Sequence, residues 1–137
     1  MATLSRPTLK IDVLTGTPNH RVTATVNVQL TKEEDALINP GRGKTGIPVN
    51  LKSNLWGDDG GLNGADDNLF LFPLQKITRS GTYTFTANVP RKVLNEDSSF
   101  WNNDDEIYSR FSLVSGSNLF PITAIAINSP VIKGQFG

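Results

Sequence analysis

The chain has 137 residues, with 13 basic and 13 acidic side chains and no cysteine. This length fits one domain over residues 1–137, with 128–137 as a possible extended tail, and it allows a core that needs no disulfides. The balanced charge gives no field to draw the chain onto nucleic acid, and no apolar run reaches the ~20 residues of a membrane span. Residues 1–7 lack the apolar stretch of a secretory signal, which leaves a cytoplasmic protein, a virion component and a mature secreted domain all open.

The first half of the chain predicts β-strands separated by turns. Residues 9–13 and 47–55 alternate between apolar and polar side chains. The clearest strand covers residues 21–30, where the even-numbered positions are apolar and the others polar, as in an antiparallel sheet with one solvated face. Residues 31–39 predict a capped helical turn, because Thr31 stands three residues before Glu34 and a proline follows.

The second half continues the β pattern. Residues 68–78 are expected to be extended but bent near Pro73, because proline donates no ladder hydrogen bond. Residues 82–89 and 107–114 alternate as half-buried strands, with a short helical turn expected at 90–94. Short strands and no long amphipathic helix indicate an all-β fold, an antiparallel β-sandwich of about seven to eight strands. Jelly-roll, C2-like and Ig-like strand orders are all left open, and a barrel is the less favoured alternative.

Two acidic stretches, each containing one of the two tryptophans, stand out. Residues 54–67 and 96–106 together hold nine of the thirteen acids and no base. Successive strands of an antiparallel sandwich alternate in direction, so successive loops alternate between its two ends. Counting from the strand at 47–55 places both acidic stretches at one end, together with the turn at 15–20. The loop at 41–46 falls at the opposite end, and a sharp reversal at Pro73 would separate the acidic stretches.

Carboxylates crowded at one end repel one another, and a hard divalent cation would relieve that repulsion. Ca²⁺ binds carboxylate, amide and backbone oxygens, and glycine-rich loops let backbone carbonyls turn inward. The candidate calcium ligands are Asp58, Asp59, Asp66, Asp67, Asp97, Asp104, Asp105 and Glu106. The acids do not follow the EF-hand pattern. Two alternatives are plain solvated loops, since Asp, Asn and Gly favour turns for backbone reasons, and a docking surface for a basic partner.

The C-terminal part of the chain predicts a strand that is apolar on both faces. It covers Pro121–Ile127, with Ile122, Ala124 and Ala126 on one face and Ile125 and Ile127 on the other. Such a strand needs cover on both sides. The cover comes either from the tail at 129–137, which contains Val131, Ile132 and Phe136, or from a second subunit. We therefore expect a homo-oligomer or a protein partner that docks on Pro121–Ile127 and the tail.

No motif supports enzymatic chemistry. The stretch at 41–46 resembles a phosphate loop, but Ile38 stands where that motif needs glycine, so a surface loop is expected. His20 is the one histidine; we expect it in a surface turn, and no Gly-x-Ser-x-Gly elbow accompanies it. The acidic loops offer no apolar pocket to raise a carboxyl pKa for glycoside hydrolysis.

The sequence favours a non-enzymatic structural or binding module. It would hold Ca²⁺ through the acidic loops at 57–67 and 95–106 and self-associate through its C-terminal strand. The alternative is a subunit of a larger particle, such as a virion decoration or tail protein or a surface filament. A third interpretation is a carbohydrate-binding module that stacks sugars on Trp56, Trp101 and Tyr108.

Overall fold

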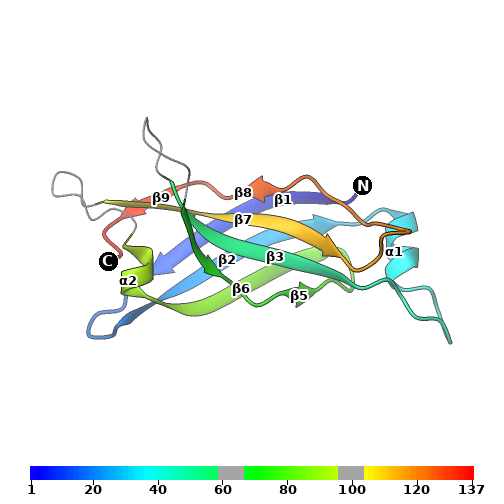
Figure 1. Cartoon of the computed structure of the whole chain (residues 1–137), viewed down its shortest axis with the longest axis horizontal. Coiled ribbons are helices and arrows are strands. Elements are labelled where there is room, and N and C mark those ends of the chain that lie inside the picture. Colours follow the sequence, from blue (N-terminus) through cyan, green and yellow to red (C-terminus); the bar gives the residue numbers. More distant parts are fainter. Residues whose placement is uncertain (59–66, 96–103) are drawn as a thin grey trace.

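A computed structural model describes residues 1–58, 67–95 and 104–137. Within these residues two β-sheets lie against each other, with one short helix near each end of the molecule (Figure 1). The strands are β1 (Thr3–Asp12), β2 (Asn19–Gln29), β3 (Val49–Gly57), β4 (Asp67–Leu71), β5 (Gln75–Lys76), β6 (Gly81–Pro90), β7 (Asp105–Ser115), β8 (Ile127–Asn128) and β9 (Ile132–Gly134). The helices are α1 (Lys32–Ile38) and α2 (Arg91–Leu94). The expected all-β sandwich is confirmed.

The strand order resolves the topology that the sequence left open. One sheet has the order β1-β2-β6 and the other the order β4-β3-β7-β8, with β5 also pairing with β3 and β9 also pairing with β7. The strand pairs are antiparallel. Because β4 and β5 both pair with β3, they act as two halves of one interrupted strand, and β8 and β9 do the same along β7. This is an Ig-like order with one change: the fourth strand pairs with the third instead of extending the sheet of the first two.

The core lies between the two sheets. In β2 the even-numbered side chains from Val22 to Val28 are fully buried, as the alternation predicts. Phe85 of β6 in the same sheet contacts Phe72 and Phe111 from the facing side, and the tilted rings form a row with centroids 5.6 Å and 6.3 Å apart. Each large aromatic side chain removes much apolar surface from water, so this row contributes strongly to the stability of the sandwich.

The short helices form where the sequence predicts them. The Glu34 backbone N–H donates to the Thr31 hydroxyl at 3.1 Å, and the Glu34 carboxylate accepts from the Thr31 N–H at 2.8 Å. This capping box satisfies two backbone donors that the first helical turn leaves free. The extended chain at 68–78 is interrupted around Pro73, between β4 and β5, and it stays beside β3 instead of reversing.

The C-terminal segment differs from the predicted strand. Pro121–Ile127 is mostly irregular, since pairing with β7 starts at Ile127 and one parallel bridge joins Ala124 to Ala2. β8 and β9 then follow β7, interrupted near Pro130. β1 also begins earlier than expected, at Thr3, and contains a bulge where Arg6 adopts a φ of 51°. Side-chain alternation cannot reveal pairing that a bulge or a proline interrupts.

Candidate binding surfaces

The described ends of the two acidic stretches meet at one end of the sandwich, which we call the acidic end. Gly57 in β3 lies opposite Asp67 of β4 on one side and Ile107 of β7 on the other. The Asp58 N–H donates to the Glu106 carbonyl oxygen at 2.7 Å. His20 and α2 lie at the same end, whereas α1 and the loop at 41–46 lie at the opposite one (Figure 1). The placement expected from strand direction is therefore confirmed for these residues.

The candidate calcium ligands are distributed unevenly around this end. Asp59, Asp66 and Asp97 lie outside the described residues. Asp58 and Asp104 are half-buried and Asp67 is exposed. Within residues 1–58, 67–95 and 104–137, no group of three or more acidic or histidine side chains is arranged to hold a metal ion.

Asp105 has a structural contact that the sequence did not predict. Its side chain is 1% exposed, and Oδ2 accepts hydrogen bonds from the backbone N–H groups of Phe136, at 2.9 Å, and Gly137, at 3.2 Å. The Phe136 ring is itself buried in the core. Next to Asp105, the Glu106 carboxylate pairs with Lys133 of β9 at 3.4 Å. Two of the candidate ligands thus hold the C-terminal tail against β7.

His20 is fully buried, so the expectation of a surface histidine is wrong. It lies inside β2, on the same face as Val22 and the rest of the buried row. Its Nδ1 accepts the Leu14 N–H at 3.1 Å, while Nε2 makes no hydrogen bond of ordinary geometry with the described residues. Burial and the nearby Arg91 guanidinium lower the pKa of His20 below its usual 6.5, and the Phe136 backbone opposes them in part. The ring is therefore held neutral.

Of the three aromatic side chains expected to stack sugars, the structure describes Trp56 and Tyr108, and neither is fully exposed. Tyr108 is only 8% exposed, and the Trp56 indole nitrogen is buried without a hydrogen-bond partner among the described residues. Trp101 lies outside the described residues. Trp56 is half-buried where β3 ends, as expected of a side chain that covers the core.

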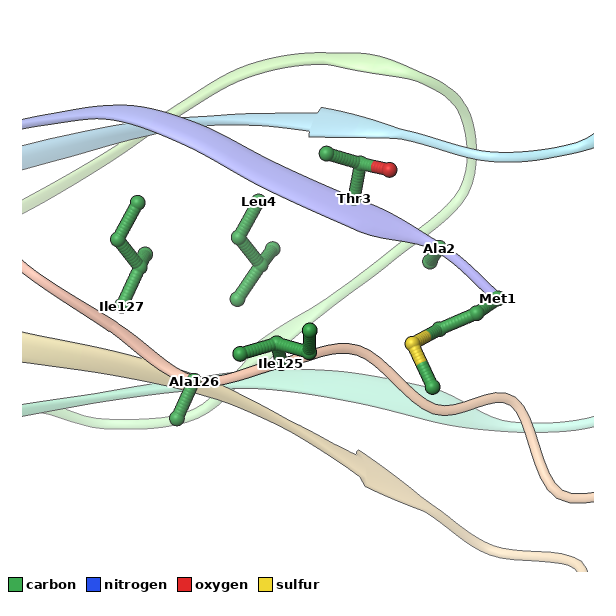
Figure 2. A pocket seen from close by; sticks show the side chains of 7 residues that line it. All are labelled: Met1, Ala2, Thr3, Leu4, Ile125, Ala126 and Ile127. Atoms are coloured by element: carbon green, nitrogen blue, oxygen red, sulfur yellow. The ribbon is translucent and has the colours of Figure 1, made fainter.

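An apolar groove lies between the start of β1 and the C-terminal segment (Figure 2). It has a volume of about 310 Å³ and is lined by Met1, Ala2, Thr3, Leu4, Ile125, Ala126 and Ile127. The Leu4 and Ile127 side chains project into the space between the two segments (Figure 2). Thr3 is the one polar residue of the lining, so the groove suits an apolar occupant.

Large apolar side chains are exposed in this C-terminal segment and just before it. Leu119 is 85% exposed, Phe120 60% and Ile125 76%, and we call these three residues the C-terminal apolar face. Ile122 is buried, so one side of the segment is covered by this chain. The tail does not cover the other side, because it runs along β7 toward the acidic end and inserts Phe136 there.

The wall of the groove formed by residues 1–4 was missed from the sequence. A signal was present, since the buried Ala2 and Leu4 flank the exposed Thr3 in the alternation of a strand. The bulge at Arg6 and Pro7 breaks that alternation before it reaches residues 9–13. The sequence therefore indicated the wall formed by the C-terminal segment but not the wall formed by residues 1–4.

Comparisons with known proteins give no family assignment. No protein-family model matches the chain, and no curated protein matches it. Among solved structures, the chain is similar to a GH3 β-glucosidase from Bifidobacterium adolescentis, with a TM-score of 0.37 and 11% identity. The match covers 97% of this chain and 17% of the β-glucosidase chain. At this level the similarity supports no argument about function. No helix among the described residues is long and apolar enough to cross a membrane.

Proposed function

We propose that this chain is a non-enzymatic structural or binding module that self-associates through its C-terminal apolar face. The observation that carries the proposal is the 76% exposure of Ile125 at the rim of an apolar groove. Burying a side chain of this kind contributes about 1.5–3 kcal/mol. Leu119 and Phe120 are exposed nearby in the sequence, and gathered apolar side chains of this kind mark contact surfaces on soluble proteins.

The direct test replaces Ile125 with aspartate. Sedimentation of the full chain over a range of concentrations is expected to show association, and Ile125→Asp is expected to abolish the part of it that uses the C-terminal apolar face, because that interface would bury an unpaired charge. Val13→Asp is the matched control, since Val13 is also an exposed apolar residue but lies beyond the end of β1 nearest the acidic end. A chain that stays monomeric at high concentration would contradict the proposal, as would association unaffected by Ile125→Asp.

A second proposal is that the acidic end binds Ca²⁺. Its support is the hydrogen bond between Asp58 and Glu106, which brings the ends of the two acidic stretches into contact. Asp105 is excluded from the ligand set here, because its carboxylate faces inward to the tail.

The calcium proposal is tested by thermal unfolding with millimolar Ca²⁺ and with chelator. A ligand at a hundred times its dissociation constant stabilises the folded state by about 2.7 kcal/mol, so a clear rise in melting temperature is expected. The rise should disappear in the double variant Asp58→Asn and Asp104→Asn. Equal melting temperatures in Ca²⁺ and chelator would remove the proposal.

A further inference from the structure

We propose that the outer edge of β6 is a second self-association site, at which β6 of one copy pairs antiparallel with β6 of another copy. β6 borders the sheet on the side away from β1 and the C-terminal segment (Figure 1). The site is therefore separate from the C-terminal apolar face and does not rest on it.

The register shows which backbone groups of β6 point outward. The Arg91 N–H donates to the Pro18 carbonyl oxygen at 2.9 Å, which continues the ladder between β6 and β2. In an antiparallel ladder, residues alternate between facing the partner strand and facing away. The backbone N–H and C=O groups of the odd-numbered residues of β6 therefore point toward β2. The residues whose N–H and C=O groups face away are Thr82, Thr84, Thr86 and Asn88.

A side-chain contact supports the same assignment. The Gln75 side chain donates to the Thr84 carbonyl oxygen at 2.5 Å, and this side chain comes from β5 in the other sheet. Among the described residues, no strand pairs with this edge of β6. The edge thus presents a row of backbone donors and acceptors, with one acceptor engaged by a glutamine side chain.

The other sheet edges carry features that block strand addition. Native proteins protect exposed edges with bulges, prolines and charged side chains. β1 has a bulge at Arg6 and Pro7 and a salt bridge between Lys10 and Asp12. The β4–β5 edge is interrupted around Pro73. The β8–β9 edge is interrupted near Pro130, and its β9 half carries Lys133.

β6 lacks these protective features over most of its length. Its ten-residue pairing with β2 has no register shift, and residues 81–89 contain neither a charge nor a proline. Pro90 ends the strand at an outward-facing position, where its missing N–H limits the free edge to residues 82–88. A regular edge of this kind accepts an added strand through main-chain hydrogen bonds.

The chemistry of the edge favours a second copy as the occupant. Antiparallel pairing centred on Phe85 places Thr84 opposite Thr86 of the other copy and uses all four outward residues of each. These residues are uncharged, so no like charges meet across the new ladder, and the chain has a net charge of zero. A charged partner strand would find no complementary charge here, whereas threonine pairs on adjacent strands are favourable.

The test uses the full chain with Ile125→Asp, which removes the C-terminal apolar face from the measurement. Sedimentation is expected to show a dimer in this background. Thr86→Pro deletes an outward N–H without removing a bond to β2, and it should weaken the dimer by about tenfold or more. Thr86→Lys should weaken it similarly. Thr8→Lys, which adds the same charge at the protected β1 edge, should leave it unchanged.

Hydrogen exchange on the same protein gives a readout that needs no β6 variant. The amides of Thr84, Thr86 and Asn88 are expected to become more protected as protein concentration rises, while outward amides of β1 do not change. A monomer at all concentrations would overturn the proposal. So would a dimer whose β6 amides exchange equally at low and high concentration, or one that Thr86→Pro leaves intact.

Discussion

The His20 ring is placed so that it cannot accept a second proton without loss. Nδ1 already accepts the Leu14 N–H, so the neutral ring has its proton on Nε2. A charged ring would point a new N–H at the Leu14 N–H, inside the core and beside Arg91. The lowered pKa of His20 follows from burial first and Arg91 second.

This lowered pKa predicts an acid-sensitive stability. The unfolded chain binds the proton near the usual pKa of 6.5, while the folded chain resists it. The contribution of His20 is therefore complete above pH 6.5 and is lost as pH falls through the window between 6.5 and the lower folded pKa. Each unit of lowering is worth about 1.4 kcal/mol. Urea unfolding at a series of pH values across this window measures it.

The control for this prediction is His20→Asn, which keeps an acceptor for the Leu14 N–H and removes the titrating ring. Because the chain has one histidine, the difference in pH slope between the two proteins isolates His20. Equal slopes would show that His20 protonates as easily in the folded state as in the unfolded one.

Two buried polar residues were within reach of sequence reasoning. His20 has the same parity as Val22 and Ala24, and Asp105 has the same parity as Ile107 and Ser109, so each occupies the buried face of its strand. We expected His20 in a turn and Asp105 in a metal site because their flanking residues are polar. The hydrogen-bond partners of these buried groups are the Leu14 N–H for His20 and the Phe136 N–H for Asp105. Both partners lie outside the regular strands, so side-chain alternation cannot predict them.

Among the elements, β7 and the tail are held together by Asp105. Asp105→Ala leaves the backbone N–H groups of Phe136 and Gly137 without this acceptor, at a cost of about 1–3 kcal/mol for the buried Phe136 group. The expected result is a lower free energy of unfolding in urea and faster hydrogen exchange over residues 132–137. Calcium plays no part in this prediction, which is measured in chelator.

The neighbouring Glu106→Gln is the control for Asp105→Ala. Glu106 makes a partly exposed ion pair with Lys133, and such pairs contribute up to about 1 kcal/mol. If both variants lose equal stability and leave exchange of the tail unchanged, the anchoring role of Asp105 is wrong.

The elements that the sequence predicts well are those with local causes. The β2 alternation and the capping box of α1 each depend on side chains only a few residues apart. The C-terminal segment depends instead on Ala2, more than a hundred residues away, and on where prolines interrupt its pairing with β7. Such pairing has no short-range pattern, which is why a regular strand was expected at Pro121–Ile127.

For the whole molecule, strand direction alone was enough to bring the acidic stretches to one end, because each loop reverses the chain once. That argument does not say which strands lie at the sheet edges, and the two proposed association surfaces depend on that order. The C-terminal apolar face lies beside β1, whereas the free edge of β6 borders the other side of the same sheet. The surfaces are independent.

Two independent self-association surfaces predict open chains of subunits, because each copy can bind one neighbour through each surface. The unmodified protein should form species larger than dimers at high concentration. Ile125→Asp and Thr86→Pro should each reduce it to dimers, and the double variant should be monomeric. Light scattering coupled to size exclusion measures all four proteins, and a double variant that still associates would show that a third surface exists.

Such chains also fit the alternative of a subunit in a larger particle, with one further consequence. Antiparallel pairing through β6 reverses strand direction between neighbours, so their acidic ends project from opposite flanks. The carboxylates of two β6 partners would then be separated by most of the length of a sandwich, beyond the ~10 Å over which charges act in ordinary salt. The β6 contact would be nearly insensitive to ionic strength, while both flanks would present a repeating negative pattern to any cationic surface.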